Sequence, residues 1–456
     1  MGASRERLGH DAAVHDLRAR LAALPPGSPV RLAKPTSNLF RFRDPDAGPG
    51  LDVSAFHGVL SVDPARRTAE VGGMTTYEDL VARTLPYGLM PAVVPQLKTI
   101  TLGGAVAGLG IESTSFHSGL VHESVLEMEI LTGDGRVLLA RPDNEHRDLF
   151  FGFPNSYGTL GYALRLEIEL RPVKPYVHIR HLRHGDAAET AAAVESLCAN
   201  GFDGQPVDFL DGTVFGPDEH YLTIGTFTDT APATSDYTGE QVYYRSIPRR
   251  ADDHLTVHDY LWRWDPDWFW CSRAFGAQHP LVRRLWPKRY RRSDVYRRLV
   301  AFDRRHRLSA RIDRLRRAPE HEPVIQDIEV PVDALPKFLD FFHREVGISP
   351  VWLCPLRQAD DRAWPLYPLR PDTLYVNVGF WATVPLRPGQ SDGHHNRLIE
   401  RVVTELGGHK SLYSNSFYDR EEFDRLYDGE HYRRLKQTYD GNGRLPDLYD
   451  KCVRAR

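Results

Sequence analysis

Apolar and charged positions alternate most clearly between residues 163 and 171. Leucine or isoleucine occupies every even position from 164 to 170, and arginine or glutamate occupies every odd position from 165 to 171. A period of two is typical of a half-buried β-strand. Pro172 ends this predicted strand, because proline has no N–H for the hydrogen-bonded ladder.

Around this strand the pattern predicts a mixture of strands and helices. A helical period covers residues 10–24 and stops at Pro25-Pro26-Gly27. A second helix is predicted at 75–85, because Thr75 and Glu78 have the spacing of a capping box. Short strands are expected at 30–33, 58–62 and 69–72, and a hairpin at 125–132 and 136–140 around a Gly-Asp-Gly turn.

The second part of the chain shows a new set of elements. Strands are predicted at 176–182, 221–227 and 373–380, and helices at 187–199, 396–406 and, as charged segments, 420–437. A chain of 456 residues is too long for one ordinary core. We therefore predict an α+β protein with a first domain at 10–175, a mixed α/β second domain at 176–400 and a helical C-terminal segment at 401–456.

Charge is unevenly distributed along the chain. The formal net charge of −3 gives no signature of nucleic-acid binding, yet residues 283–317 contain fifteen Lys and Arg against three Asp. Four of the eight tryptophans, at positions 262, 264, 268 and 270, directly precede this basic stretch. A basic, Trp-rich segment at 260–317 suits contact with an anionic phospholipid membrane through Trp268 and Trp270. The alternative is a solvated helix beside a Trp-rich core.

The cysteines and the N-terminus indicate the compartment. Cys198, Cys271, Cys354 and Cys452 lie far apart, which supports neither a disulfide framework nor a metal site. The N-terminus has no apolar signal region, and no run approaches the length of a membrane span. We therefore expect a cytoplasmic protein without a metal, in peripheral contact with the inner face of the plasma membrane.

The segment TITLGGAVAGLGIES at 99–113 is rich in glycine and has no lysine or arginine. Such backbone allows a ligand to approach closely. Gly104, Gly108 and Gly110 do not have the GxGxxG spacing of a dinucleotide fold, and no phosphate-loop lysine follows them. The segment is therefore neither a Rossmann nor a P-loop nucleotide site.

A series of short motifs extends along the chain: VPQLKTITLGG at 94–104, GIES at 110–113, Gly119-Leu120, GTLGY at 158–162, WLCP at 352–355, REEF at 420–423, Tyr427-Asp428-Gly429, Tyr432 and PDLYDK at 446–451. Their order resembles the FAD-binding domain of the vanillyl-alcohol-oxidase superfamily, and more closely the Δ24-sterol reductases and their bacterial relatives that reduce methylene-branched fatty acyl chains. The resemblance covers nearly the whole chain from about residue 10.

The resemblance implies a two-domain PCMH-type fold that binds FAD without a covalent link, with backbone amides of the TxGG loop on the pyrophosphate. The residues that it places near FAD are Ser37, Asn38, Thr101, Leu102, Gly103, Gly104, Gly108, Gly110, Ile111, Glu112, Ser113, Gly119, Gly158, Gly161, Ile168 and Lys451. It also implies NADPH as the electron donor.

The implied reaction is the reduction of an isolated C=C bond in a lipid. Such an alkene needs a proton on one carbon and a hydride on the other, so the site needs an acid. The candidates are Tyr418, Glu422, Tyr432 and His117; Tyr418 and Glu422 share a face only where a helix includes both. The Arg-, Ala- and Pro-rich composition is typical of a high-GC bacterium, which favours a methylene-branched acyl chain of a phospholipid over a sterol.

Two other functions fit parts of the pattern. The same flavin fold could oxidise an alcohol or a 2-hydroxy acid, although the sequence shows no Arg/His cluster for a small polar substrate. A flavin-free, non-catalytic lipid-binding protein is the third possibility. The colour of the purified protein and the reduction of its flavin distinguish these three functions.

Overall fold

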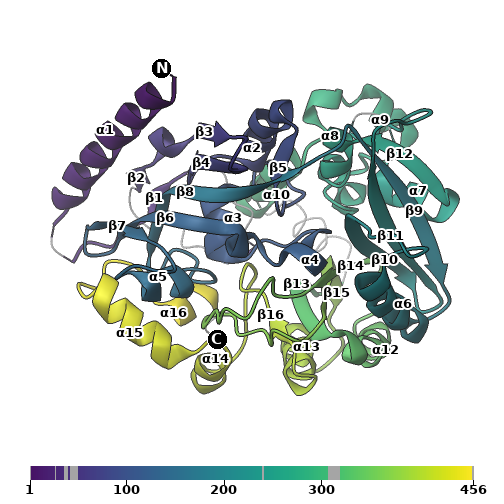
Figure 1. Cartoon of the computed structure of the whole chain (residues 1–456). Coiled ribbons are helices and arrows are strands. Elements are labelled where there is room, and N and C mark those ends of the chain that lie inside the picture. The colour runs from purple at the N-terminus through teal and green to yellow at the C-terminus, as the bar shows by residue number, and fades with distance from the viewer. Residues whose placement is uncertain are drawn as a thin grey trace.

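The computed structural model describes residues 2–25, 27–34, 40–41, 50–238, 241–306 and 319–453. Its centre consists of two large β-sheets, each in its own half of the molecule (Figure 1). The chain passes from the first sheet to the second between Pro172 and Tyr176. The predicted α+β fold is confirmed.

The first sheet has the strand order β3-β4-β8-β6-β7, and β5 pairs with β8 outside that path. Its strands are β3 (Val59–Asp63), β4 (Thr68–Gly72), β5 (Leu89–Pro91), β6 (Val125–Thr132), β7 (Val137–Ala140) and β8 (Gly161–Pro172). All of these pairings are antiparallel, and β6 and β7 form the predicted hairpin. The alternating strand at 163–171 is thus the central strand.

Helices surround this first sheet, and a small parallel pair of strands precedes it. They are α1 (Gly2–Ala22), α2 (Tyr77–Thr84), α3 (Leu102–Gly108), α4 (Ser115–Ser118) and α5 (Arg147–Gly152), with β1 (Leu32–Ala33) and β2 (Leu51–Asp52). Helix α1 begins earlier than predicted. The N-cap of α2 is Thr76, which accepts a hydrogen bond from Asp79 N, so the predicted capping box of Thr75 and Glu78 is wrong by one residue.

The second sheet is antiparallel throughout and has the order β12-β9-β11-β10-β14-β15-β13-β16. Its strands are β9 (Tyr176–His184), β10 (Phe209–Gly216), β11 (Glu219–Thr228), β12 (Asp252–Thr256), β13 (His321–Pro331), β14 (Val351–Leu356), β15 (Tyr375–Pro385) and β16 (His409–Lys410). The sequence did not predict β10, β13 and β14. Pro323 and Pro355 lie within two of them and weaken the strand signal.

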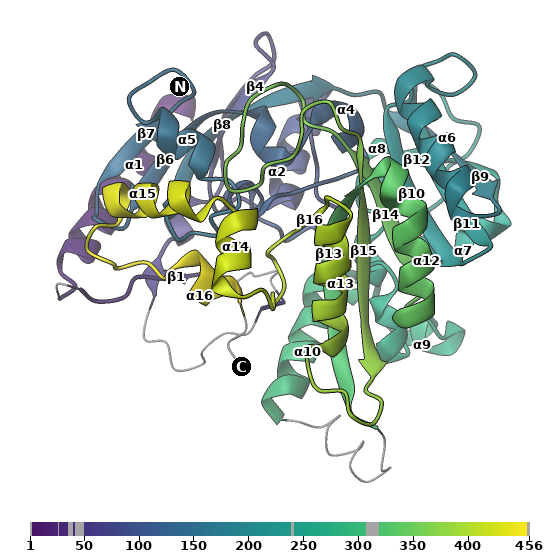
Figure 2. The ribbon, with the colours of Figure 1, turned by 90° about the horizontal axis from the view of Figure 1, so that it is seen from below.

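Helices cover one face of the second sheet. These are α6 (Ala187–Asn200), α12 (Leu335–Glu345) and α13 (His394–Glu405), and the last two cross the sheet side by side in Figure 2. Val324, Ile328 and Val330 of β13 belong to the core under these helices. Because side chains alternate along a strand, residues 325, 327 and 329 lie on the opposite face. That opposite face looks toward the first domain.

The segment between β12 and β13 is mostly helical. It contains α8 (Val257–Leu261), α9 (Pro280–Leu285) and α10 (Ser293–His306), while α7 (Tyr243–Ser246) precedes β12. Trp262, Trp264, Trp268 and Trp270 are all buried here. The prediction that Trp268 and Trp270 contact a membrane is therefore wrong, because their rings pack inside the protein. No helix among the described residues is long and apolar enough to cross a membrane.

The C-terminal helices return to the first domain. They are α14 (Arg420–Leu426), α15 (Gly429–Tyr439) and α16 (Leu448–Cys452), and they lie below the first sheet in Figure 2. Lys436 Nζ donates to Thr159 O at 2.8 Å, and Tyr439 OH donates to Asp148 Oδ1 at 2.6 Å. These bonds fix α15 against α5 and against the loop before β8.

Candidate active site

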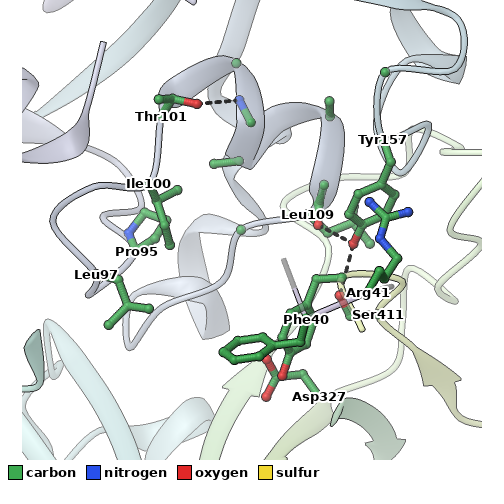
Figure 3. Close-up of a pocket in the computed structure, with 18 of the residues that line it drawn as sticks. Phe40, Arg41, Pro95, Leu97, Ile100, Thr101, Leu109, Tyr157, Asp327 and Ser411 are labelled. Carbon is green, nitrogen blue, oxygen red and sulfur yellow. Dashed lines mark hydrogen bonds between the residues drawn. The ribbon is translucent and has the colours of Figure 1, made fainter. Parts of the chain in front are cut away.

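A cavity of about 740 Å³ is lined by residues of both domains and of the C-terminal segment. Its size falls within the range of about 300–1,000 Å³ that is usual for ligand pockets. One wall is formed by residues 95–112 and 157–163. The other is formed by the face of the second sheet that α6, α12 and α13 do not cover. Figure 3 shows part of the first wall, with Asp327 opposite it.

The first wall is built from backbone rather than from large side chains. Thr101 is the N-cap of α3, and its Oγ accepts a hydrogen bond from Gly104 N at 3.3 Å. A Cβ on Gly103 would lie 2.8 Å from Gly73 O, so glycine allows α3 to approach β4 this closely. A Cβ on Gly104 would meet only Thr101 Oγ at 2.8 Å and Lys34 Nζ at 3.9 Å. A side chain at position 104 would therefore enter the cavity.

The opposite wall combines aromatic rings with two carboxyl groups. Strand β13 contributes Asp327 and Glu329, which alternate with its core residues. Strands β14 and β15 contribute Trp352 and Trp381. Gly379 pairs with both Asp327 and Trp352, and a Cβ there would lie 2.4 Å from Asp327 Oδ1. The absence of a side chain at 379 thus leaves room for the carboxyl group of Asp327.

Burial raises the pKa of both carboxyl groups on β13 to near neutral pH, so each is partly protonated there. Burial raises the pKa of Asp327 to about 7, although hydrogen bonds from Asn377 and Tyr413 oppose the rise. Burial, together with the neighbouring charge of Asp327, raises the pKa of Glu329 to about 8. Glu329 accepts a hydrogen bond from Tyr367, and Trp381 Nε1 donates to Tyr413 OH at 2.9 Å. The wall therefore offers a protonated carboxyl group among aromatic rings.

A third carboxyl group, that of Glu112, reaches the cavity from the glycine-rich wall. Gln96 and Ser113 donate hydrogen bonds to it, and Arg263 Nη2 lies 3.8 Å from its Oε1. Burial raises the pKa of Glu112 to about 7, whereas the positive charge of Arg263 lowers it. Arg263 in turn forms a buried ion pair of 2.7 Å with Asp211. Glu112 is therefore part of a buried ionic network behind the wall.

The end of the chain closes the cavity beside Tyr157. Tyr157 OH donates to Gly108 O at 2.7 Å and lies 3.3 Å from Ser411 Oγ (Figure 3). The guanidinium of Arg41 lies over its ring at 4.4 Å. Lys451 Nζ donates to Tyr157 O at 2.7 Å. Residues 41, 157, 411 and 451, from four separate parts of the chain, thus meet at one corner.

Part of the first wall belongs to a segment that matches a known family of domains. Residues 26–141 match the model of an FAD-binding domain. The Δ24-sterol reductase of Homo sapiens is 26% identical over 416 residues, which cover 87% of this chain and 76% of that protein. The chain therefore contains an FAD-binding domain and is homologous to the Δ24-sterol reductases over most of its length.

Two further relatives delimit this likeness. The Δ24-sterol reductase of Arabidopsis thaliana is 26% identical over 453 residues, 89% of this chain and 77% of that protein. Decaprenylphosphoryl-β-D-ribose oxidase of Mycolicibacterium smegmatis is 32% identical over only 125 residues, 27% of each chain. The likeness to the sterol reductases therefore spans most of the chain, whereas that to the oxidase covers about a quarter of it.

The cavity of this flavoprotein suits FAD. Its glycine-rich wall lets backbone amides approach an anionic pyrophosphate, and Arg31, Lys34 and Arg41 line the same cavity. Among the described residues, buried polar atoms at this wall without a hydrogen-bond partner include Arg41 Nη2, Gln96 Oε1 and Thr99 Oγ. Such atoms are rare unless a ligand or water satisfies them. The residues around 101–111 would hold the cofactor. The bound flavin would supply hydride to a substrate that lies against the aromatic rings of the opposite wall.

Most of the predicted cofactor residues line the cavity. They are Thr101, Gly103, Gly104, Gly108, Gly110, Ile111, Glu112, Gly158, Gly161 and Lys451. Leu102 and Ile168 instead pack in the core. Ser113 donates a hydrogen bond to Glu112 without lining the cavity, and a Cβ on Gly119 would meet the side chain of Glu123. Ser37 and Asn38 lie outside the described residues.

None of the four predicted acids lines the cavity. Helix α14 begins at Arg420 with Asp419 as its N-cap, so Tyr418 precedes the helix and does not share a helical face with Glu422. Tyr432 OH accepts a hydrogen bond from Leu448 N at 3.0 Å and joins α15 to α16. His117 lines a different, shallower pocket, where its Nε2 lies 3.0 Å from Asp208 O. The structure therefore places other acids, foremost Asp327, at the cavity.

A group of potential metal ligands lies elsewhere. His178, Asp252 and His254 bring ligand atoms within 4.8 Å of one another on β9 and β12. The two histidine rings stack at 4.2 Å, and Arg180 lies 3.9 Å from the same aspartate. None of these residues lines the cavity.

Replacing Gly104 with leucine is expected to prevent FAD binding without unfolding the protein. The new side chain would extend into the cavity, and only the Thr101 hydroxyl, 2.8 Å from the new Cβ, would have to shift. The ratio of flavin to protein absorbance after purification measures binding, and thermal unfolding measures folding. Gly9→Leu, on the exposed side of α1, is the control. A yellow G104L protein would mean that the cofactor does not pass along this wall.

Proposed function

We propose that this flavoprotein reduces an isolated C=C bond in a lipid, a methylene-branched acyl chain of a phospholipid or the Δ24 bond of a sterol, with NADPH as the electron donor. The observation that carries the proposal is the wall opposite the glycines. There the carboxyl group of Asp327, whose pKa burial raises to about 7, lines the cavity together with Trp352, Trp381 and Phe269. Aromatic rings suit an apolar chain, and an unactivated alkene needs an acid.

Asp327 is the residue that we assign as the proton donor. Its proton would pass to the less substituted alkene carbon, which leaves a tertiary cation for the hydride equivalent that reduced FAD supplies. Asn377 Nδ2 lies 3.5 Å from Asp327 Oδ1 and orients the carboxyl group. The pKa of Glu112 is also raised to about 7, but Glu112 is less suited to this role because Gln96, Ser113 and Arg263 already surround its Oε1.

The residues around Asp327 would also control access and polarity. Phe269 stacks between Trp264, at 4.9 Å, and Trp381, at 4.5 Å, so the aromatic wall is continuous. Such a wall excludes water from the reacting carbon atoms and strengthens the interaction of the acid with developing charge. A small 2-hydroxy acid would gain little from this surface.

The purified protein is expected to carry a flavin spectrum that NADPH bleaches under anaerobic conditions. Addition of a methylene-branched phospholipid or of a Δ24 sterol should then restore the oxidised spectrum and yield the saturated lipid, which mass spectrometry detects. A flavin that bleaches with a 2-hydroxy acid but not with NADPH would instead support a dehydrogenase. A colourless protein that FAD does not restore would refute the enzyme.

A further inference from the structure

Exposed apolar side chains gather on one short part of the chain. Among the described residues, eight large hydrophobic side chains are exposed, and six of them lie between positions 281 and 302. These six are Leu281, Val282, Leu285, Tyr290, Leu299 and Phe302. The most exposed of them, Leu285, shows 83% of its side chain to solvent. A concentration of this kind marks an interaction surface, whereas single exposed apolar residues are ordinary.

The six residues belong to one unit, α9 and α10 with their connection, which we call the α9–α10 unit (residues 280–306). On α9, Leu281 and Leu285 are four positions apart, and on α10, Leu299 and Phe302 are three apart, so each helix presents a stripe. Arg291 Nη2 donates to Trp286 O at 2.9 Å, and Trp286 lies 6.2 Å from the ring of Tyr296. The unit is therefore internally packed, although its outer side is apolar.

Cations accompany these stripes. Residues 281–306 contain ten Lys and Arg and two Asp, a net charge of +8 in a chain whose total is −3. Arg284, Lys288, Arg289 and Arg298 are exposed. An exposed apolar stripe bordered by arginine and lysine matches the interface of an anionic bilayer, where acyl chains meet negative headgroups.

Inward-facing residues fix the unit against the active site. Arg283 pairs with buried Asp267 at 2.8 Å, and Arg292 pairs with Glu78 of α2 at 2.6 Å. Tyr296 of α10 forms a buried cluster with Trp268, against which Phe40 and Leu97 pack. Trp268, Phe40 and Leu97 also line the cavity. One layer of side chains thus joins the wall of the cavity to the inner side of the α9–α10 unit.

We propose that the α9–α10 unit docks on an anionic phospholipid membrane and holds the cavity next to the lipid surface. The inference rests on the proposed lipid substrate. The four tryptophans are buried and do not contact the membrane. The leucines and Phe302 on the two helices would contact it instead. A substrate acyl chain would then reach the aromatic wall from the bilayer without crossing bulk water.

The test uses the full-length holoprotein and vesicles of diphytanoyl lipids, whose chains contain no C=C bond. Wild-type protein is expected to sediment with vesicles of phosphatidylglycerol and phosphatidylcholine, but only weakly with phosphatidylcholine alone. Leu285→Ser with Phe302→Ser should weaken binding at least about tenfold, because two apolar side chains lose their burial. Arg284→Gln with Arg289→Gln should weaken it by about 10- to 30-fold at low salt.

Leu8→Ser with Arg18→Gln is the matched control, since both residues are exposed on α1 at another surface. Equal sedimentation of the control and of L285S/F302S would overturn the proposal, as would the absence of wild-type binding. A wild-type dimer in solution that L285S/F302S converts to monomer would also overturn it, because a second copy would then cover the surface. Since these vesicles contain no substrate, failure here is distinct from failure of NADPH to bleach the flavin. Retained flavin absorbance shows that each variant is folded.

Discussion

Asp327→Asn is expected to reduce the rate of lipid-alkene reduction by about 100- to 10,000-fold, the usual contribution of a positioned general acid. Asparagine has nearly the same shape, so it fits the space beside Gly379, but it cannot release a proton to an alkene carbon. FAD should remain bound, because Asp327 lies on the wall opposite the glycine-rich loop. NADPH should bleach the variant as fast as the wild type, and only reoxidation by the lipid should slow.

The pH profile provides a second measurement of the same assignment. The pKa of Asp327 is raised to about 7 by burial, so the protonated form that donates is abundant below this pH and lost above it. The single-turnover rate of lipid reduction should therefore fall as the pH rises through 7. Glu329→Gln is the control, since Glu329 is a neighbouring carboxyl group with its own tyrosine partner. A larger loss in E329Q than in D327N would move the assignment to Glu329.

Arg263→Met is expected to lower the free energy of unfolding by about 3–5 kcal/mol, because it leaves a buried carboxylate without its partner. Arg263 is fully buried and pairs with Asp211 at 2.7 Å, and it also lies over the ring of Tyr260 at 3.9 Å. Trp264 Nε1 and Trp352 Nε1 donate to the same carboxylate at 3.3 and 3.2 Å, which does not replace a full positive charge. Denaturant unfolding of the holoprotein measures the loss.

Arg66→Met is the control for this experiment. Arg66 is exposed and forms an ion pair of 3.2 Å with the half-buried Glu167, and pairs at the surface contribute at most about 1 kcal/mol. A similar change in both variants would show that the Arg263–Asp211 pair is not the source of the stability. Arg263→Met with Asp211→Asn should recover part of the loss, since the second change removes the unpaired charge.

The cofactor side of the site could be predicted from the sequence because its signals are local. Thr101, Gly103 and Gly104 are consecutive or nearly so, and one capped turn of helix explains all three. The hairpin at 125–140 was predictable for the same reason, since its turn and its strands lie within sixteen residues. Short-range patterns of this kind depend on the backbone preferences of neighbouring residues, which can be predicted from a single sequence.

The acid side could not be predicted, because its residues meet only through sheet pairing. Asp327 and Glu329 alternate with apolar residues and look like the solvated face of an edge strand. Only the pairing of β13 with β15 shows that Gly379 and Trp381 face them and that the first domain covers this face. The signal that remained in the sequence was the closely spaced acids of the segment QDIEV at 326–330.

The basic, Trp-rich segment contains both a buried aromatic part and an exposed apolar part. The sequence suggested a membrane contact or a buried core, and the tryptophans belong to the core. They pack because Asp265 and Asp267 anchor the segment: Ser293 Oγ donates to Asp265 at 2.6 Å, and Ser272 Oγ donates to Asp267 at 2.9 Å. The sequence pattern does not single out the exposed apolar residues, since Leu285 and Phe302 are scattered among arginines.

The corner where Tyr157 meets Lys451 has a consequence for biosynthesis. The cavity wall includes residues from position 31 to position 451. The glycine-rich wall is therefore synthesised long before Lys451, and this corner of the cavity stays open until α16 is in place. A variant that stops before α16 would leave the corner open permanently.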